Sequence, residues 1–433
     1  MQDTSAELLS FQTLLQHCFQ RSDWFFDLLT PQNLLQRPIG LRHPFIFYLG
    51  HLPAFAWNQV VRGLFGEGHL SAEFDRLFER GIDPDSLEGA AASSIHAWPS
   101  VEAVLAYRDR VRAEILARIP QVLEKTEDIL GQHGRILHLV AEHELMHHET
   151  LLYMLQELPD MPLAPEALLA GVDGDGRAAE PRRVEAGTVR VGLDFDAIPW
   201  GWDNEFGRWE VAVQAFTLDS LPVRNRDWLD FLGRVSEDQR AALWPVNWQK
   251  DGSRHWVKTV QGRVPFERAA GWPVQVSGQQ ARRYAQAHNA RLPTEPELRH
   301  AAFGTPSGEV RAYPWGEAHP TADRGNFGFA RLTPTPVGAH PAGASAWGVE
   351  ELLGNGWEWT TTPFEALPGF RAYARTYPGY SADFFDGAHD VVFGASWATD
   401  EKLLRASFRN WYRRDYPYVF SSFRLVRESC IPA

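Results

Sequence analysis

The chain has 433 residues, 44% of them hydrophobic, and a formal net charge of −13. This length allows two or three domains with sizeable cores, and the negative charge argues against binding to nucleic acid or to anionic membranes. Cys18 and Cys430 form no disulfide framework, and neither a secretory leader nor an apolar run of about 18 residues occurs, so a cytoplasmic protein is expected.

The first part of the chain has the pattern of amphipathic helices. Leucine-rich runs repeat with a period near 3.6 residues, clusters of β-branched residues are few, and Pro159 follows the last run. The pattern predicts four helices, over residues 5–20, 44–64, 100–127 and 135–158. We expect them to form a helical bundle that occupies residues 1–160.

A segment rich in proline, glycine and charged residues follows the bundle and predicts a linker over residues 161–183. Beyond it the sequence changes to short strands, Gly and Pro turns and many tryptophans, with a few helices expected, such as those over 277–289 and 295–302. Residues 184–433 are therefore expected to fold as an irregular α+β domain. The predicted fold class of the whole chain is α + (α+β).

The last helix of the predicted bundle carries two histidines at the spacing of metal ligands. His143 and His147 are four residues apart, so both imidazoles leave the same face of the helix. Neighbours such as Leu139 and Leu151 indicate a largely buried helix, and burying two imidazoles without a partner is costly. The pair therefore predicts half of a transition-metal site, with a pair of satisfied surface histidines as the alternative.

The best third ligand lies upstream, in the apolar helical stretch 44–57, which contains His51. Taken alone, His51 is typical of a core histidine, but with His143 and His147 it completes a three-histidine set from two packed helices. Three neutral ligands leave open positions on a redox metal such as Fe(II). Glu149 is a poor ligand because it points roughly 200° away from His147, so it either supports a ligand or faces solvent.

Residues 143–147 also spell His-Glu-x-x-His, the signature of zinc proteases, with Glu144 as the general base. A zinc hydrolase needs a third ligand in a recognisable downstream context, and the sequence offers none. This distant alternative predicts zinc and a large loss of activity on Glu144→Gln. A non-enzymatic alternative, a binding module carried on a bundle, predicts no stoichiometric metal.

The second part of the chain contains several distinctive short motifs. They are Val189-Arg-Val-Gly-Leu, Arg291-Leu-Pro-Thr-Glu-Pro-Glu-Leu, Gly354-Asn-Gly-Trp-Glu-Trp-Thr and Gly394-Ala-Ser-Trp, together with residues 216–228. These motifs resemble the formylglycine-generating-enzyme fold, a C-type-lectin-like module. Members that oxidise a sulfatase cysteine carry a reactive cysteine pair in this module. Because only Cys430 lies in this part of the chain, that activity is not expected.

The first part, with His51 and His143-x-x-x-His147-x-Glu149, is similar to the DinB-type four-helix bundle. The two modules in this order resemble the ergothioneine-type sulfoxide synthases, and most closely the selenoneine synthase branch. The resemblance implies a non-haem Fe(II) enzyme that uses O₂ to join sulfur or selenium to the imidazole C2 of hercynine (trimethylhistidine). His51, His143 and His147 are the implied iron ligands.

The resemblance also implies residues that act on the substrates. A tyrosine in this family supplies a proton during the O₂-dependent step; the best match is Tyr380, with Tyr377 next and Tyr373 third, and each has packing as its alternative role. A quaternary ammonium cannot donate a hydrogen bond, so it requires aromatic faces or a diffuse negative field. Trp411 and Tyr412 stand where this family binds its substrate.

The identity of the sulfur or selenium donor depends on the segment near the C-terminus. Members that use γ-glutamylcysteine read its carboxylates there with an acid and an arginine, and Tyr412 and Tyr416 occupy those positions here. An aromatic lip suits a sugar, and residues 79–84 look more like the selenoneine branch, so a selenosugar donor is predicted. The alternative donor is γ-glutamylcysteine or cysteine. The substrate-binding candidates are Trp411, Tyr412, Arg413, Arg414, Tyr416 and Arg80.

Overall fold

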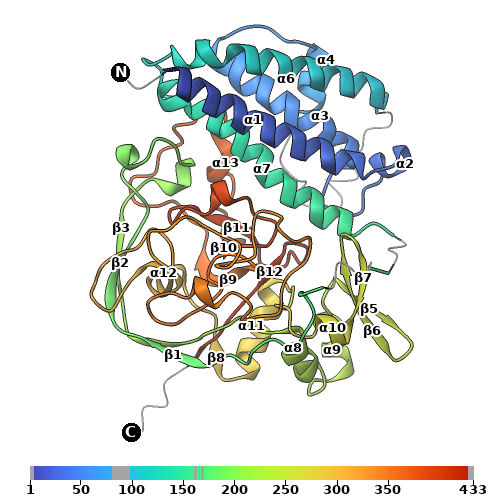
Figure 1. Ribbon diagram of the computed structural model, residues 1–433, viewed down its shortest axis with the longest axis vertical. Helices are drawn as coiled ribbons and strands as arrows, with labels where there is room; N and C mark the ends of the chain where they lie inside the picture. The colour runs from blue at the N-terminus through green and yellow to red at the C-terminus, as the bar shows by residue number, and fades with distance from the viewer. Residues whose placement is uncertain (1–3, 80–97, 160–162, 165, 167–169, 428–433) are drawn as a thin grey trace. The chain divides into compact units, whose positions relative to one another are not determined.

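The computed structural model describes residues 4–79, 98–159, 163–164, 166 and 170–427 (Figure 1). Its contacts divide the chain into two compact units. The first unit comprises Met1–Pro159 and two short segments from later in the sequence, Ile198–Trp202 and Ala372–Gly379. The second comprises Asp160–Ala197, Asp203–Arg371 and Tyr380–Ala433. The expected boundaries at residues 160 and 183 remain a prediction, and they do not anticipate the two short segments.

The four long helices of the first unit confirm the four that periodicity predicts. They are α1 (Thr4–Asp27), α3 (Phe45–Ala56), α6 (Val101–Leu123) and α7 (Arg135–Gln156). The predicted helix over 44–64 changes its hydrogen bonding midway, because α3 continues as the π-helix η1 (Trp57–Leu64). Three elements too short for a periodic signal were not predicted, namely α2 (Pro31–Leu34), α4 (Ala72–Leu77) and the 3-10 helix η2 (Gln132–Gly134).

Helix α3 is the central element of the bundle, because all of its residues are buried. It packs against α6 and α7, and α1 packs against the same two helices. Figure 1 shows these four long helices side by side. All faces of α3 are therefore covered by other parts of the protein, so the side chain of His51 is shielded from water.

The second unit is built from small sheets and short helices. Two of the sheets have four strands, in the orders β1-β4-β13-β8 and β11-β10-β9-β12, and two smaller sheets have the orders β2-β3 and β5-β6-β7. The strands are β1 (Pro181–Val184), β2 (Gly187–Val191), β3 (Trp209–Val213), β4 (Phe216–Asp219), β5 (Trp248–Asp251), β6 (Arg254–Thr259), β7 (Gly262–Pro265), β8 (Ala290–Arg291), β9 (Gly356–Pro363), β10 (His389–Ala395), β11 (Asn410–Arg413), β12 (Ser421–Ser422) and β13 (Val426–Arg427).

The helices of the second unit are α8 (Asn225–Leu232), α9 (Glu237–Leu243), α10 (Phe266–Ala269), α11 (Gly278–Ala287), α12 (Glu295–Phe303) and α13 (Gly379–Ala382), the last of which begins at the final residue of the first unit. Helices α11 and α12 confirm the two that the sequence predicts. Each begins with a capping box, Ser277 with Gln280 and Thr294 with Glu297, so the side chains bond the free backbone amides of the first turn.

Together the bundle and the α+β unit confirm the expected fold class. The strand β10 is antiparallel to both β9 and β11, and its residue Asp390 lies opposite Tyr412. None of the helices in the described ranges combines the length with the hydropathy that a bilayer crossing would need.

Candidate metal centre

Three histidines meet inside the first unit. His51 comes from α3, and His143 and His147 come from successive turns of α7. The Nε2 atom of His143 lies 3.3 Å from Nε2 of His51 and 3.2 Å from Nε2 of His147. His51 and His143 are 1% and 4% exposed, whereas His147 is partly buried, so two of the three imidazoles are shielded from bulk water. The predicted set of three ligands is thus brought together by the fold.

Helix α3 surrounds the histidines with aromatic rings at helical spacing. Phe47 and Phe55 stand one turn before and one turn after His51, and Tyr48 stands three residues before it. Phe47 stacks on His51 with ring centroids 5.1 Å apart, and Phe55 stacks on His143 at 3.5 Å. Tyr48 lies 5.6 Å from the ring of His147. Each imidazole therefore has an aromatic neighbour that restricts its rotation.

The protonation of the cluster follows from burial. Loss of hydration lowers the pKa of His51 to about 4 and lowers the pKa values of His143 and His147 well below the usual range of histidine. The Nδ1 atom of His51 lies 2.8 Å from the carbonyl oxygen of Phe78. Since a carbonyl only accepts, Nδ1 carries the proton, and Nε2 presents its lone pair to the cluster.

Three convergent neutral nitrogens fit a transition metal. Two imidazole nitrogens at about 2.0–2.1 Å from one metal ion, with bond angles between about 90° and 110°, lie roughly 2.8–3.4 Å apart. The two Nε2–Nε2 distances fall in that range. Nε2 of His143 is close to Nε2 of both His51 and His147, and it cannot donate a proton to one and accept a proton from the other at the same time. Without a cation, at least one of these two contacts would therefore be unfavourable. The hydrogen bond from His51 to the Phe78 carbonyl is the usual outer support of a metal-bound histidine.

A segment from far along the sequence completes the surroundings of the histidines. Ala372–Gly379 belongs to the first unit, and its Tyr377 ring lies 5.1 Å from Phe55 and 6.4 Å from His143, perpendicular to both within about 12°. In the same segment, the hydroxyl of Tyr373 donates to the carbonyl of Gly201 at 2.5 Å. Tyr377 is thus the candidate tyrosine that contacts the cluster's aromatic neighbours, although the resemblance favours Tyr380.

Tyr380 belongs to the second unit, where its buried ring packs edge-on against Trp411 at 5.2 Å. Trp411 also stacks on Phe364 at 4.0 Å, with the planes within 6° of parallel, and lies 5.5 Å from Phe384. Trp411 therefore has one face covered by Phe364 and sits in an aromatic group. That group has the composition that a quaternary ammonium requires.

Tyr412, the next residue of β11, leaves the opposite face of the strand and has different partners. Its ring stacks on the ring of Tyr416 at 5.8 Å, with the planes within 8° of parallel, and Tyr416 packs edge-on against Tyr418. The two tyrosines of the expected aromatic lip thus stack on each other, with Tyr416 buried. Whether it contacts a substrate stays a prediction.

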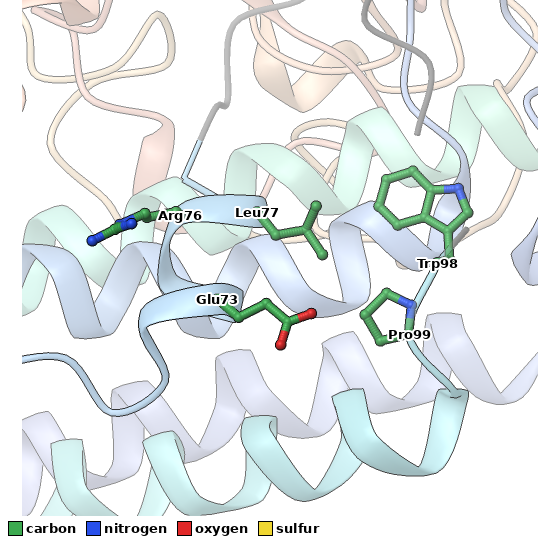
Figure 2. A pocket seen from close by; sticks show the side chains of 5 residues that line it. All are labelled: Glu73, Arg76, Leu77, Trp98 and Pro99. Atoms are coloured by element: carbon green, nitrogen blue, oxygen red, sulfur yellow. The ribbon is translucent and has the colours of Figure 1, made fainter. Parts of the chain in front are cut away.

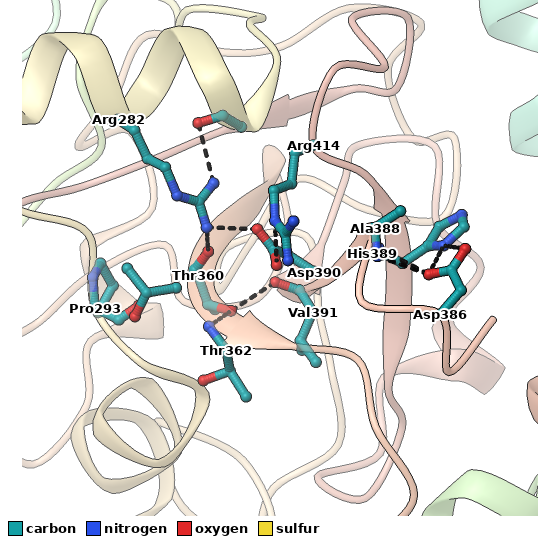
Figure 3. Close-up of polar contacts among 12 residues, drawn as sticks. Arg282, Pro293, Thr360, Thr362, Asp386, Ala388, His389, Asp390, Val391 and Arg414 are labelled. Carbon is teal, nitrogen blue, oxygen red and sulfur yellow. Dashed lines mark hydrogen bonds and ion pairs between the residues drawn. The ribbon is translucent and has the colours of Figure 1, made fainter.

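The two arginine candidates differ in their surroundings. Arg414 donates from Nε to Asp390 at 2.9 Å, and Arg282 of α11 donates to the other oxygen of the same carboxylate (Figure 3). Asp390 is fully buried, whereas the side chain of Arg414 is 34% exposed. Arg413 instead pairs with its exposed neighbour Asp415 at 3.4 Å. Arg80 lies outside the described residues.

Glu144, the base of the zinc-hydrolase alternative, faces away from the histidine cluster. Its carboxylate accepts a 2.5 Å hydrogen bond from Ser22 of α1 and lies 3.6 Å from a guanidinium nitrogen of Arg112. Ser22 also lies 2.8 Å from Nε2 of His148. Glu149 is 6% exposed, which excludes the expected alternative that it faces solvent. Glu144 and His148 of α7 thus contact the neighbouring helix α1 through Ser22.

A cavity of about 530 Å³ lies beside α4 and the start of α6, lined by Glu73, Arg76, Leu77, Trp98 and Pro99. Figure 2 shows Arg76 on the opposite side of this cavity from Trp98. The Trp98 ring is 6.4 Å from Phe47, which in turn stacks on His51. The cavity-lining ring of Trp98 thus reaches His51 only through the ring of Phe47.

Sequence reasoning missed three features of the centre. Phe55 stands one turn after His51, so helical periodicity was a usable signal for it. The ion pair of Asp128 with Arg375 joins residues 247 positions apart, and the packing of Tyr377 on the bundle is similarly remote, so no local pattern indicates either.

Two family models match the chain and confirm both resemblances. Residues 172–429 match the sulfatase-modifying factor enzyme 1-like domain, and residues 14–151 match the DinB superfamily. Together the two matches extend over both units.

Three named relatives align with about two thirds or more of the chain. Ergothioneine biosynthesis protein 1 of Neurospora crassa is 30% identical over 93% of this chain and 56% of its own length, so the chain spans little more than half of that protein. Hercynine oxygenase of Mycolicibacterium smegmatis is 33% identical over 83% of this chain and 84% of its own. That of Mycobacterium tuberculosis is 39% identical over 66% and 70%. Among solved structures, PvdO from Pseudomonas aeruginosa matches 57% of this chain and 94% of its own, with 18% identity and a TM-score of 0.42.

Proposed function

Because this chain belongs to the ergothioneine-type sulfoxide synthase family, we propose that it joins sulfur or selenium to C2 of the hercynine imidazole, using O₂ and Fe(II). The observation that carries the proposal is the convergence of the nitrogens of His51, His143 and His147, all within 4.8 Å of one another. Bound Fe(II) would supply open coordination positions and one-electron chemistry for O₂. Neutral histidines hold such an ion without a protein carboxylate, which keeps the centre cationic and attractive to a thiolate or selenolate.

The protein surroundings give the centre its orientation and exclude water. Phe47 and Phe55 lie against His51 and His143, so neither imidazole rotates freely and the space beside them is apolar. An apolar wall strengthens electrostatic interactions at the centre and limits loss of reactive species to solvent. Both effects suit an O₂-dependent step.

We propose Tyr377 as the residue that supplies the proton during this step. Its ring lies within 6.4 Å of the His143 ring and packs edge-on to Phe55, all within the first unit. The hydroxyl of Tyr373 is already committed to the Gly201 carbonyl, which leaves Tyr373 a supporting role. Tyr380, first in the ranking by resemblance, packs on Trp411 and is better suited to shape the substrate site.

Trp411 is the proposed contact for the trimethylammonium group of hercynine. Phe364 stacks on its indole, and the rings of Tyr380 and Phe384 lie 5.2 and 5.5 Å from it, so a cation bound at this group would meet several aromatic rings. Cation–π contacts of this kind recognise quaternary ammonium groups, which cannot form hydrogen bonds.

For the donor we propose a selenosugar. The stacked rings of Tyr412 and Tyr416 provide an aromatic surface on which the apolar face of a sugar would lie. The alternative, γ-glutamylcysteine or cysteine, is favoured by Arg414, whose guanidinium is oriented by the buried Asp390 and is partly exposed. Two arginines share the single carboxylate of Asp390, which leaves positive charge for an incoming carboxylate.

The test is anaerobic reconstitution with Fe(II), followed by O₂, hercynine and one donor at a time: a selenosugar, γ-glutamylcysteine or cysteine. Mass spectrometry identifies the product, and His51→Ala is the metal-free control. A C–Se adduct formed with the selenosugar alone supports the proposed donor. A sulfoxide formed from a thiol supports the alternative donor. No adduct with any donor, despite one bound iron per chain, would contradict the proposed reaction.

A further inference from the structure

The segment that carries Tyr377 has a defined local fold. Within Ala372–Gly379, the amide of Arg375 donates to the carbonyl of Tyr373 at 2.8 Å, and the amide of Tyr377 donates to the carbonyl of Ala374 at 2.7 Å. Two successive tight turns thus fix the spacing between the side chains of Tyr373, Arg375 and Tyr377. Pro378 follows Tyr377 and restricts its backbone further. A movement of Arg375 is therefore passed on to Tyr377.

Arg375 is held by the bundle through two parallel hydrogen bonds. Its two terminal nitrogens donate to the two oxygens of Asp128 at 2.9 and 2.7 Å. The carboxylate is itself oriented, because one oxygen also accepts from the amide of Leu130 at 2.9 Å. The guanidinium beside Asp128 holds the pKa of that carboxyl below its usual range. A bidentate pair of this kind fixes direction as well as distance.

A second attachment lies at the other end of the segment. The hydroxyl of Tyr373 donates to the carbonyl of Gly201, and the neighbouring Trp202 donates from its indole to Glu142 at 2.8 Å. Glu142 directly precedes the ligand His143 on α7. The segment is thus tied both to the loop after α6 and, through Ile198–Trp202, to the helix that carries two of the ligands.

Arg135, the first residue of α7, connects the two attachments. The side chain of Arg135 donates to the carbonyl of Ile129, next to Asp128, and to the carbonyl of Pro199 at 3.0 Å. The two remote segments and the loop 128–132 therefore form one hydrogen-bonded group on the first unit.

We infer that Asp128 and Arg375 are positioning residues that place Tyr377 beside His143, with Tyr373 as the second fixed point. The inference rests on the proposed function, because it takes Tyr377 as the proton donor. The pair is partly exposed, with side-chain exposures of 29% and 46%, so it contributes little to overall stability. Its effect is expected in the placement of one ring, where a displacement of about 1 Å reduces a rate up to about 100-fold.

The test compares Asp128→Asn and Arg375→Met with Glu67→Gln. Glu67 forms the same kind of bidentate pair with Arg118 on the bundle, at 2.6 and 2.8 Å, and is a matched control because it contacts neither remote segment. The protein is labelled with 3-fluorotyrosine, and Tyr377→Phe identifies the resonance of residue 377. Co(II), which is paramagnetic, or Zn(II), the diamagnetic reference, is added to the three-histidine site.

Wild type and Glu67→Gln should show strong Co(II) broadening of the Tyr377 resonance. Asp128→Asn and Arg375→Met should lose at least about half of it, bind the same amount of metal, keep the wild-type melting temperature, and form adduct about tenfold more slowly. Broadening that survives in both variants would overturn the inference, as would reduced broadening with unchanged rate. Failure of the proposed function is recognised separately, because wild type itself would then form no adduct.

Discussion

Phe55 lies flat against the metal-ligand candidate His143, with ring centroids 3.5 Å apart and planes within 5° of parallel. The two side chains belong to different helices, α3 and α7. The contact therefore couples the orientation of a ligand on α7 to the helix that carries His51. It also keeps one face of the imidazole dry, which helps to hold His143 in its neutral, metal-binding form.

Replacing Phe55 with leucine should weaken metal binding without unfolding the bundle. Leucine fills most of the volume but has no flat face to restrict the His143 ring, so we expect about tenfold lower affinity, as for other supports of metal ligands. Competition titration with Co(II) measures it. Phe19→Leu is the control, because Phe19 is a similarly buried phenylalanine on α1. Equal losses in both variants would show that the effect is general loosening of the bundle.

Substitution of any of the three ligands should abolish stoichiometric metal. His51→Ala, His143→Ala and His147→Ala each remove one nitrogen from a set of three, and we expect the bound metal to fall from one ion per chain to near zero. Elemental analysis after dialysis measures it. His138→Ala should keep its metal, because His138 lies on the same helix but packs on Phe11 and Trp200. Retention of metal by His51→Ala would contradict the assignment.

Glu144→Gln separates the proposed function from the zinc-hydrolase alternative. A general base contributes about 10²–10⁴-fold to a rate, so its loss would be severe in a hydrolase. Because Glu144 bonds Ser22 rather than facing the cluster, we expect full metal content and adduct formation within about threefold of wild type. A loss of 100-fold or more, with metal retained, would favour the alternative.

The sequence was sufficient to predict the long helices and the three histidines that the fold brings together, although only His143 and His147 are linked by short-range spacing. His143 and His147 share a face by their four-residue separation, and His51 stands out in an apolar helix. The motifs of the second unit were similarly local, as in the Thr294 capping box. Residue spacings and capping motifs of this kind can be recognised in a single sequence because they do not depend on which residues pack against them.

The environment of the ligands was not predictable in the same way. Tyr377 and Tyr380 are three residues apart in a tyrosine-rich segment, and nothing in their neighbours indicates that they belong to different units. The contacts that place Tyr377 in the first unit, such as the packing of its ring on Phe55, join residues more than 300 positions apart. The change from α3 to the π-helix η1 was also invisible, since an apolar periodicity does not specify its hydrogen bonding.

The three tyrosines should differ when each is changed to phenylalanine. Tyr377→Phe keeps the ring against Phe55 but loses the proton, so we expect adduct formation to fall by about 10²–10⁴-fold. Tyr373→Phe loses the bond to Gly201 and should cost about tenfold. Tyr380→Phe keeps its packing on Trp411 and should act mainly on the KM for hercynine. Initial rates over a range of hercynine concentrations separate kcat from KM and measure this order, and a largest loss of kcat for Tyr380→Phe would restore the ranking by resemblance.

Asp203 makes the stability of the second unit depend on pH. Burial raises its pKa to about 6, against a partial opposing effect of the hydrogen bond from Ser381. A raised pKa means that the folded state binds the proton more tightly, so this stabilisation is complete below about pH 4 and is lost as pH rises through 6. Relative to Asp203→Asn, wild type should lose about 1–2 kcal/mol between about pH 5 and pH 8. Urea unfolding at both values measures it, and a constant difference would contradict the assignment.

Gly63 of η1 permits the close approach of the segment that carries Tyr377. A Cβ at residue 63 would lie 2.3 Å from Cγ2 of Thr376, the residue just before Tyr377. Alanine at this helical position favours the helix by about 0.8–1 kcal/mol, so Gly63→Ala should keep or raise the melting temperature while it displaces Thr376 and slows adduct formation several-fold.

Thr376→Ser removes Cγ2 and should restore most of the rate in the Gly63→Ala background, because the clashing atom is gone. Gly68→Ala is the matched control, since nothing lies within 4 Å of a Cβ at that position. A general effect of alanine on the helix would not depend on residue 376, so recovery of the rate by Thr376→Ser identifies the contact between residues 63 and 376 as the cause. If Gly63→Ala were as active as Gly68→Ala, or if Thr376→Ser restored nothing, contact between η1 and this segment would not be what sets the position of Tyr377.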